Sequence, residues 1–144
     1  MFKVPEKTTQ KRLADWRNLR QYLETSDTPF DDVSSFFNQF PKTKVYTDPY
    51  DQSSWPTAWE LIEENQYCSF NIVLGICYTL QLCSRFEKLK PKITISIDKA
   101  TNSVYYLLVM ENMVYGYEDE CWINTKSLPK SLKTIKIYTM PPLH

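Results

Sequence analysis

Residues 68–82 read Cys-Ser-Phe-Asn-Ile-Val-Leu-Gly-Ile-Cys-Tyr-Thr-Leu-Gln-Leu, the longest apolar stretch of the chain. Apolar residues occupy most sides of the helix that this stretch predicts, so the helix should lie at the centre of a domain and be covered by other elements. We expect it to extend from Cys68 to Phe86. Glycine in a helix interior costs about 1 kcal/mol relative to alanine, so Gly75 predicts the close approach of another backbone.

Three helices are predicted before this stretch. Residues 8–24 have apolar side chains at helical spacing, and residues 28–40 repeat the pattern with phenylalanines. A third, shorter helix is expected over residues 57–64, because Thr57 and Glu60 have the spacing of a capping box.

After Pro91 the apolar period changes from helical spacing to alternation, which is typical of strands. Residues 93–97, 104–110, 113–117 and 134–139 are the predicted strands, and Glu111 and Asn112 form a tight turn between the second and the third. We place the left-handed residue of that turn at Asn112.

Helices followed by a run of antiparallel strands predict an α+β domain. We expect N-terminal helices and a central apolar helix packed on an antiparallel sheet of about four strands. The 144 residues are the length of one domain, 1–144, with a helical part over 8–64, the core helix over 68–86 and the sheet over 92–139.

The composition disfavours several functional classes. Lys plus Arg and Asp plus Glu both number 17, so the chain lacks the basic surplus of most nucleic-acid-binding proteins. Two glycines exclude glycine-rich phosphate loops, and the apolar run is shorter than the roughly 20 residues that span a bilayer. Four cysteines without a zinc spacing, and one histidine, predict no metal and no cofactor.

The stretch Trp55-Pro-Thr-Ala-Trp-Glu-Leu-Ile, followed by Tyr67-Cys68, resembles the transglutaminase-like superfamily, which is related to papain-like enzymes. The resemblance implies that Cys68 stands at the nucleophile position at the start of the core helix. It places the family's histidine near Ser103 or Val104, at the start of a later strand, and its aspartate near residues 115–117.

Neither partner is found where the resemblance expects it. The sequence contains one histidine, His144, which is the last residue. The aspartate nearest to residues 115–117 is Asp119. A cysteine attacks as a thiolate, and in these folds an imidazole on a strand takes its proton. We therefore expect the fold of a cysteine enzyme without its catalytic dyad, and no catalytic residue.

A second resemblance covers nearly the whole chain. The segments Asp48-Pro-Tyr-Asp, Ser54-Trp-Pro-Thr-Ala-Trp, Leu74-Gly-Ile-Cys-Tyr and Met140-Pro-Pro-Leu are similar to a small conserved protein of cyanobacterial phages with contractile tails. The resemblance implies a phage context and no particular activity. That context implies that the protein is a component of the phage particle or takes part in its assembly.

Aromatic residues supply the candidate binding surface. Large amphipathic rings with few rotamers are favoured at protein interfaces. They crowd one loop with the helix after it, and one predicted hairpin. The candidate binding residues are Tyr50, Trp55, Trp59, Tyr105, Tyr106, Tyr115, Tyr117 and Trp122. The alternative is that the same rings fold over a small core.

The sequence therefore predicts a non-catalytic phage protein that acts through protein–protein contacts, as a virion structural or assembly component. Its partners would be other phage proteins, and its location the host cytoplasm during infection or the virion. One alternative is a cysteine-dependent hydrolase or transferase with an unconventional base, and another is a phage factor that binds a host protein.

Overall fold

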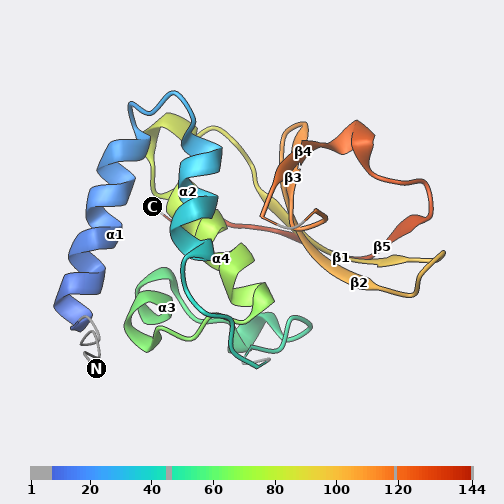
Figure 1. Ribbon diagram of the computed structural model, residues 1–144, viewed down its shortest axis with the longest axis horizontal. Coiled ribbons are helices and arrows are strands. Elements are labelled where there is room, and N and C mark those ends of the chain that lie inside the picture. Colours follow the sequence, from blue (N-terminus) through green and yellow to red (C-terminus); the bar gives the residue numbers. More distant parts are fainter. Residues whose placement is uncertain (1–7, 45–46, 119, 144) are drawn as a thin grey trace, which may run out of the picture.

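The computed structural model describes residues 8–44, 47–118 and 120–143. Its four α-helices are α1 (Thr9–Leu23), α2 (Pro29–Asn38), α3 (Ala58–Glu64) and α4 (Ser69–Gln81). Its five strands are β1 (Lys92–Asp98), β2 (Val104–Met110), β3 (Met113–Tyr115), β4 (Trp122–Asn124) and β5 (Leu132–Thr139). The helices gather on one side and the sheet on the other (Figure 1), so the predicted α+β class is confirmed.

The sheet is antiparallel throughout, with the order β4-β3-β2-β1-β5. The sequence predicts four of these strands and misses β4, which has only three residues and thus no visible alternation. None of the helices in the described part of the chain has the length and apolar character that crossing a bilayer requires.

Helix α4 lies between the other helices and the sheet (Figure 1). It contacts α2 and α3 on one side and β2 on the other, and every residue from Phe70 to Gln81 is buried. Its buried threonine, Thr79, has hydrogen-bond partners within the protein. The Trp16 indole donates to the Thr79 hydroxyl at 2.8 Å, and that hydroxyl donates to the Gly75 carbonyl at 2.6 Å. The core position predicted for this helix is confirmed.

The helix ends five residues earlier than predicted, at Gln81 instead of Phe86. A separate 3₁₀ turn, Ser84–Phe86, follows it. The Glu24 carboxylate accepts hydrogen bonds from the backbone N–H groups of Ser84 and Arg85, both at 2.9 Å. A side chain from the end of α1 thus caps a new turn where the sequence pattern suggests a continuous helix.

Two details of the strands also differ from expectation. In β5 the isoleucines Ile135 and Ile137 are 50% and 57% exposed, whereas Tyr138 is buried against Trp55. The pairing of β1 with β5 shifts its register between Ile95 and Ser96, and this irregularity interrupts the alternation of buried and exposed residues in β5. In the turn after β2 the residue with positive φ is Glu111, at 55°, and not the predicted Asn112.

Gly75 is approached by a side chain and not by the expected backbone. A Cβ atom built on Gly75 would lie 2.5 Å from Cε1 of the Phe37 ring. Phe37 belongs to α2 and is fully buried, with Phe36 and Tyr67 packed edge-on against it. The missing methyl group therefore allows α2 to pack closely on α4.

We predict that Gly75→Ala destabilises the protein. Alanine favours a helix by about 1 kcal/mol, but overpacking a core costs about 1–3 kcal/mol, and the buried Phe37 ring has little room to move. Urea unfolding measures the loss. In a Phe37→Leu background the same substitution should become neutral or stabilising. Equal losses in both backgrounds would show that the ring is not the cause.

Candidate active site at the start of helix α4

Cys68 is the N-cap residue of α4, directly before its first helical residue, Ser69. The chain reaches it from α3 through a short connection in which Asn65 adopts left-handed geometry, with φ 55°. Tyr67, the preceding residue, is stacked on Phe40 at 4.9 Å between ring centroids. Packing on both sides therefore fixes the backbone at Cys68, and the thiol residue is only 3% exposed.

Strand β2 places Tyr106 beside this end of the helix. Its ring contacts Phe70 edge-on at 5.4 Å. Burial raises the pKa of the Tyr106 phenol, and the nearby groups of Tyr50, Cys68 and Asp48 add to the shift. The phenol is therefore protonated at neutral pH and cannot take a proton from the thiol. Nothing in the sequence pattern distinguished Tyr106 from the neighbouring Tyr105.

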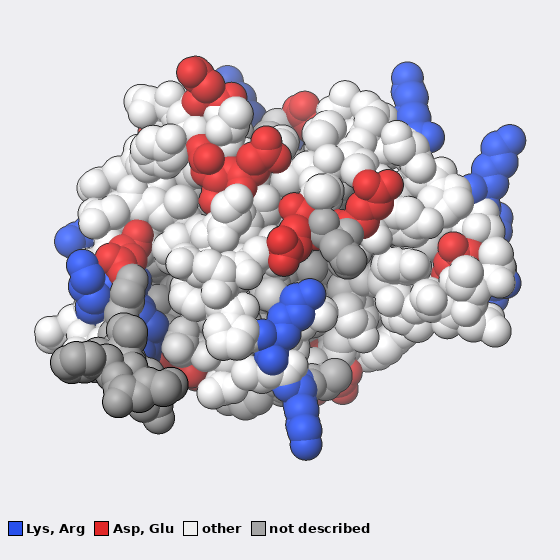
Figure 2. All heavy atoms as spheres, viewed as in Figure 1, with Lys and Arg blue, Asp and Glu red and all other residues white. Residues whose placement is uncertain are grey.

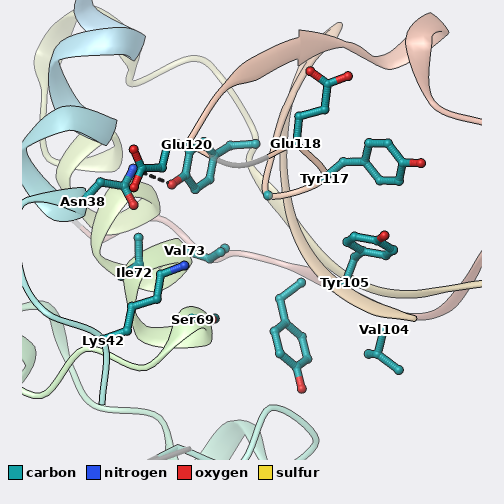
Figure 3. Close-up of a pocket in the computed structure, with 13 residues that line it drawn as sticks. Asn38, Lys42, Ser69, Ile72, Val73, Val104, Tyr105, Tyr117, Glu118 and Glu120 are labelled. Carbon is teal, nitrogen blue, oxygen red and sulfur yellow. Dashed lines mark hydrogen bonds between the residues drawn. The ribbon is translucent and has the colours of Figure 1, made fainter. Parts of the chain in front are cut away.

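A cavity of about 240 Å³ opens beside the first two turns of α4 (Figure 3). Ser69 lines it from the helix, and Tyr105 and Tyr117 line it from the sheet, with their rings 4.9 Å apart. Lys42 reaches into it from the segment after α2, and Glu118 lies on the opposite wall (Figure 3). The site thus combines an aromatic wall with charges of both signs.

Tyr115 occupies the region where the transglutaminase-like resemblance expects an aspartate. Its hydroxyl accepts a hydrogen bond from Asn38 Nδ2 at 2.7 Å, which ties β3 to the end of α2 (Figure 3). Trp122 strengthens this wall by stacking on Phe30 at 4.7 Å and donating to the Phe30 carbonyl at 2.9 Å. The Tyr115 side chain therefore makes a structural contact in this region. Asp119 and His144 lie outside the described residues.

The structure brings most of the candidate binding residues to one region and separates one of them. The four hairpin tyrosines, Tyr105, Tyr106, Tyr115 and Tyr117, all line the cavity. Tyr50 is exposed and lies near Tyr106, while Trp55 packs on Phe70 and Tyr138. Trp59 lies elsewhere, edge-on to Trp16 at 5.7 Å. Binding of a partner by these residues stays a prediction.

Sequence reasoning overlooked Asn71, a polar residue in the first turn of the apolar helix. Its amide nitrogen donates to the Gln66 carbonyl at 2.9 Å, which places the side chain against the segment that leads to Cys68. Its oxygen is buried and has no hydrogen-bond partner among the described residues. A lone asparagine between Phe70 and Ile72 is the signal that could have found it.

The four cysteines differ in their environments. Burial raises the pKa of the Cys83 thiol to about 11 and raises that of Cys77 further. Both are therefore poor nucleophiles in the folded protein. Cys121 is exposed and lies outside the core. In the described part of the chain, no three His, Cys, Asp or Glu side chains are placed to hold a metal ion.

Comparison with known proteins supports the fold. No protein-family model matches the chain, and no curated protein matches its sequence. The structure of Legionella pneumophila LapG superposes with a TM-score of 0.72 at 19% identity, over 94% of this chain and 76% of that one. The calcium-bound form of LapG superposes with a TM-score of 0.69 at 20% identity, over 94% of this chain and 78% of that one.

LapG is a transglutaminase-like cysteine protease, so the predicted transglutaminase-like fold is confirmed. The same finding corrects one conclusion of the sequence analysis. The expectation that the protein is not an enzyme is wrong, because its structural neighbours are a cysteine protease. The absence of a histidine near Cys68 was too narrow a basis for excluding catalysis. The phage context stays a prediction.

We predict that the protein loses stability between about pH 9 and pH 12. The pKa of Cys83 is about 11 and that of Tyr67 about 12, both raised by burial from their ordinary values of 9.0 and 10.0. Above pH 9 the unfolded chain releases protons that the folded chain keeps, so the stabilisation is complete below that pH and is lost as pH rises. Urea unfolding midpoints at pH 8, 9.5 and 10.5 measure it. Constant midpoints across this range would contradict the prediction.

Proposed function

We propose that the protein is a cysteine-dependent hydrolase or transferase in which Cys68 is the nucleophile. The observation that carries the proposal is the position of this thiol: it heads the core helix directly before Ser69, which lines a cavity, in a fold shared with LapG. An acyl-enzyme intermediate on the Cys68 sulfur is the expected outcome of attack on a carbonyl carbon.

The start of α4 supplies hydrogen-bond donors for such a reaction. The first backbone N–H groups of a helix have no partner within the helix. The Cys68 side chain does not cap them, so the N–H groups of Ser69 and Phe70 are free of a side-chain cap. Donors of this kind stabilise the oxyanion that forms at an attacked carbonyl, and the helix dipole favours negative charge at the same end.

The base is the unconventional part of the site. Tyr106 is protonated, and the Asn71 amide oxygen is too weak a base to deprotonate a thiol. A cysteine needs a base less than a serine does, because a few per cent of a free thiol is already thiolate at pH 7. We therefore propose that Cys68 acts without a paired imidazole among the described residues and that attack is slow.

Access to the sulfur is restricted. Cys68 is 3% exposed, whereas its neighbour Ser69 lines the cavity and is exposed. We propose that an acyl group approaches the thiol from the side of Ser69, between α4 and the tyrosines of β2. The predicted partner surface coincides with this route, so we propose that the hairpin tyrosines contact the substrate.

An acylation assay tests the proposal. In a Cys121→Ser background, which removes the exposed thiol, p-nitrophenyl acetate should release p-nitrophenolate in a burst of one equivalent. Intact-mass spectrometry and peptide mapping should place the acetyl group on Cys68. Cys68→Ser in the same background should lose the burst by more than about tenfold, since a hydroxyl without a base is a weak nucleophile.

The result that would sink this proposal is a burst that survives Cys68→Ser, or an acetyl group mapped to another residue while Cys68 stays unmodified. The protein partner is a separate matter. That the partner is another phage protein stays a prediction. Peptide mass spectrometry of purified phage particles tests it. If the protein is absent from the particles, the prediction that it is a virion component is wrong.

A further inference from the structure

We propose that the outer edge of β5 binds an extended, acidic segment of a partner protein, which adds to the sheet as a further strand. Strand β5 stands at the end of the sheet order β4-β3-β2-β1-β5 and pairs with β1 alone. Its other edge presents backbone N–H and C=O groups that no described strand uses. The inference goes beyond the proposed function, because no part of it involves Cys68.

The length and exposure of β5 are unusual for an edge strand. With eight residues it is the longest of the described strands, and residues 133–137 are all exposed. Its neighbour β1 is buried over most of its length. Edge strands in natural proteins are commonly short or covered by other elements, because an open edge pairs readily with another chain. A long, open edge strand is therefore a candidate for strand addition.

Exposed apolar side chains gather at this end of the sheet. Ile135 and Ile137 are each at least half exposed, and Val104, at the start of β2, is 48% exposed. These are three of the six large hydrophobic side chains that are exposed in the described part of the chain. Ile135 also has no partner residue on β1, because the register shifts beside it. An added strand would remove apolar surface of this kind from water, which favours binding.

The charge of this region indicates the chemistry of the partner. Residues 121–144 contain four lysines and no Asp or Glu, in a chain whose total charge is zero: Lys126, Lys130, Lys133 and Lys136. All four are exposed, and none forms a salt bridge with a carboxylate of the described residues. Figure 2 shows basic side chains projecting from the end of the molecule that holds the sheet, whereas most carboxylates lie over the helices and the middle of this face. An acidic segment therefore complements the edge.

The same lysines disfavour a second copy of this chain as the occupant. Two β5 strands paired edge to edge would bring Lys133 and Lys136 of both copies along one seam, with no carboxylate in either stretch to offset them. Like charges on neighbouring strands are destabilising, and lysines on an edge are a common protection against pairing between copies. An acidic strand neutralises the lysines instead, so this protection does not act against it.

A nucleic acid is the other class of partner that lysines attract. Proteins that bind single strands combine a basic groove with exposed rings on which the bases stack. The one aromatic residue of β5, Tyr138, is buried and packs against Trp55. The exposed side chains of the strand are those of Lys, Thr and Ile. Without a stacking surface on the strand, a peptide strand fits this edge better.

Three matched peptides test the proposal by fluorescence anisotropy with the full chain. The first alternates valine and glutamate over the length of β5. The second has lysine in place of each glutamate, and the third keeps the acidic sequence but carries a methyl group on every backbone nitrogen. We expect the acidic peptide to bind at least about tenfold more tightly than either control, because lysine removes the charge complementarity and methylation removes the backbone hydrogen bonds.

Amide hydrogen exchange and charge reversal locate the contact. On addition of the acidic peptide, exchange should slow in β5 and stay unchanged in β4, which is the opposite edge of the sheet. Lys133→Glu with Lys136→Glu should weaken binding of the acidic peptide by about tenfold or more. The matched control, Lys11→Glu with Arg17→Glu, makes the same change of charge on α1, at the other end of the molecule (Figure 1), and should leave the affinity nearly unchanged.

Four results would overturn the proposal. Equal binding of the acidic peptide and its methylated form would show that charge alone holds the peptide. Tighter binding of oligothymidine than of the acidic peptide would make the partner a nucleic acid. A dimer in sedimentation velocity that Ile137→Lys dissociates would make a second copy the occupant. Failure of the acidic peptide to bind at about 1 mM would show that the edge does not accept an acidic strand.

Discussion

The contact between the Phe37 ring and the bare backbone of Gly75 sets the position of α2 against α4, and the candidate site depends on that position. Helix α2 ends at Asn38, which bonds to Tyr115, and the segment that follows it carries Lys42 into the cavity. Closely packed interiors transmit small displacements because few voids absorb them. A methyl group at Gly75 would therefore be felt at the cavity wall as well as in the core.

Burial of α4 also fixes the position of Cys68. The helix is buried along almost its whole length, so its first residues cannot fray, and Cys68 keeps one backbone position. If Cys68 is the nucleophile proposed above, this fixed position contributes to rate, because a nucleophile that is already oriented has lost its freedom before the reaction begins.

The amino-acid sequence predicts the parts of this fold that rest on local patterns. The capping box of Thr57 and Glu60, the core helix and the strand from Val104 to Met110 all appear as expected, because each depends on residues close together in the chain. The early end of α4 does not, since it depends on Glu24, about 60 residues away. The site divides in the same way. The position of Cys68 is visible in the sequence, whereas the choice of Tyr106 over Tyr105 as its neighbour depends on the register of β2 against β1.

Tyr106 lies beside the start of α4 and is half-buried, and desolvation raises the pKa of its phenol. The phenol therefore keeps its proton at neutral pH, so it can donate a hydrogen bond near the proposed nucleophile but cannot take a proton from it. If Cys68 acts as proposed, a base for its thiol must come from elsewhere than Tyr106. The geometry at the start of α4 thus bears on where a reaction would occur, and the protonation of Tyr106 bears on which residue could assist it.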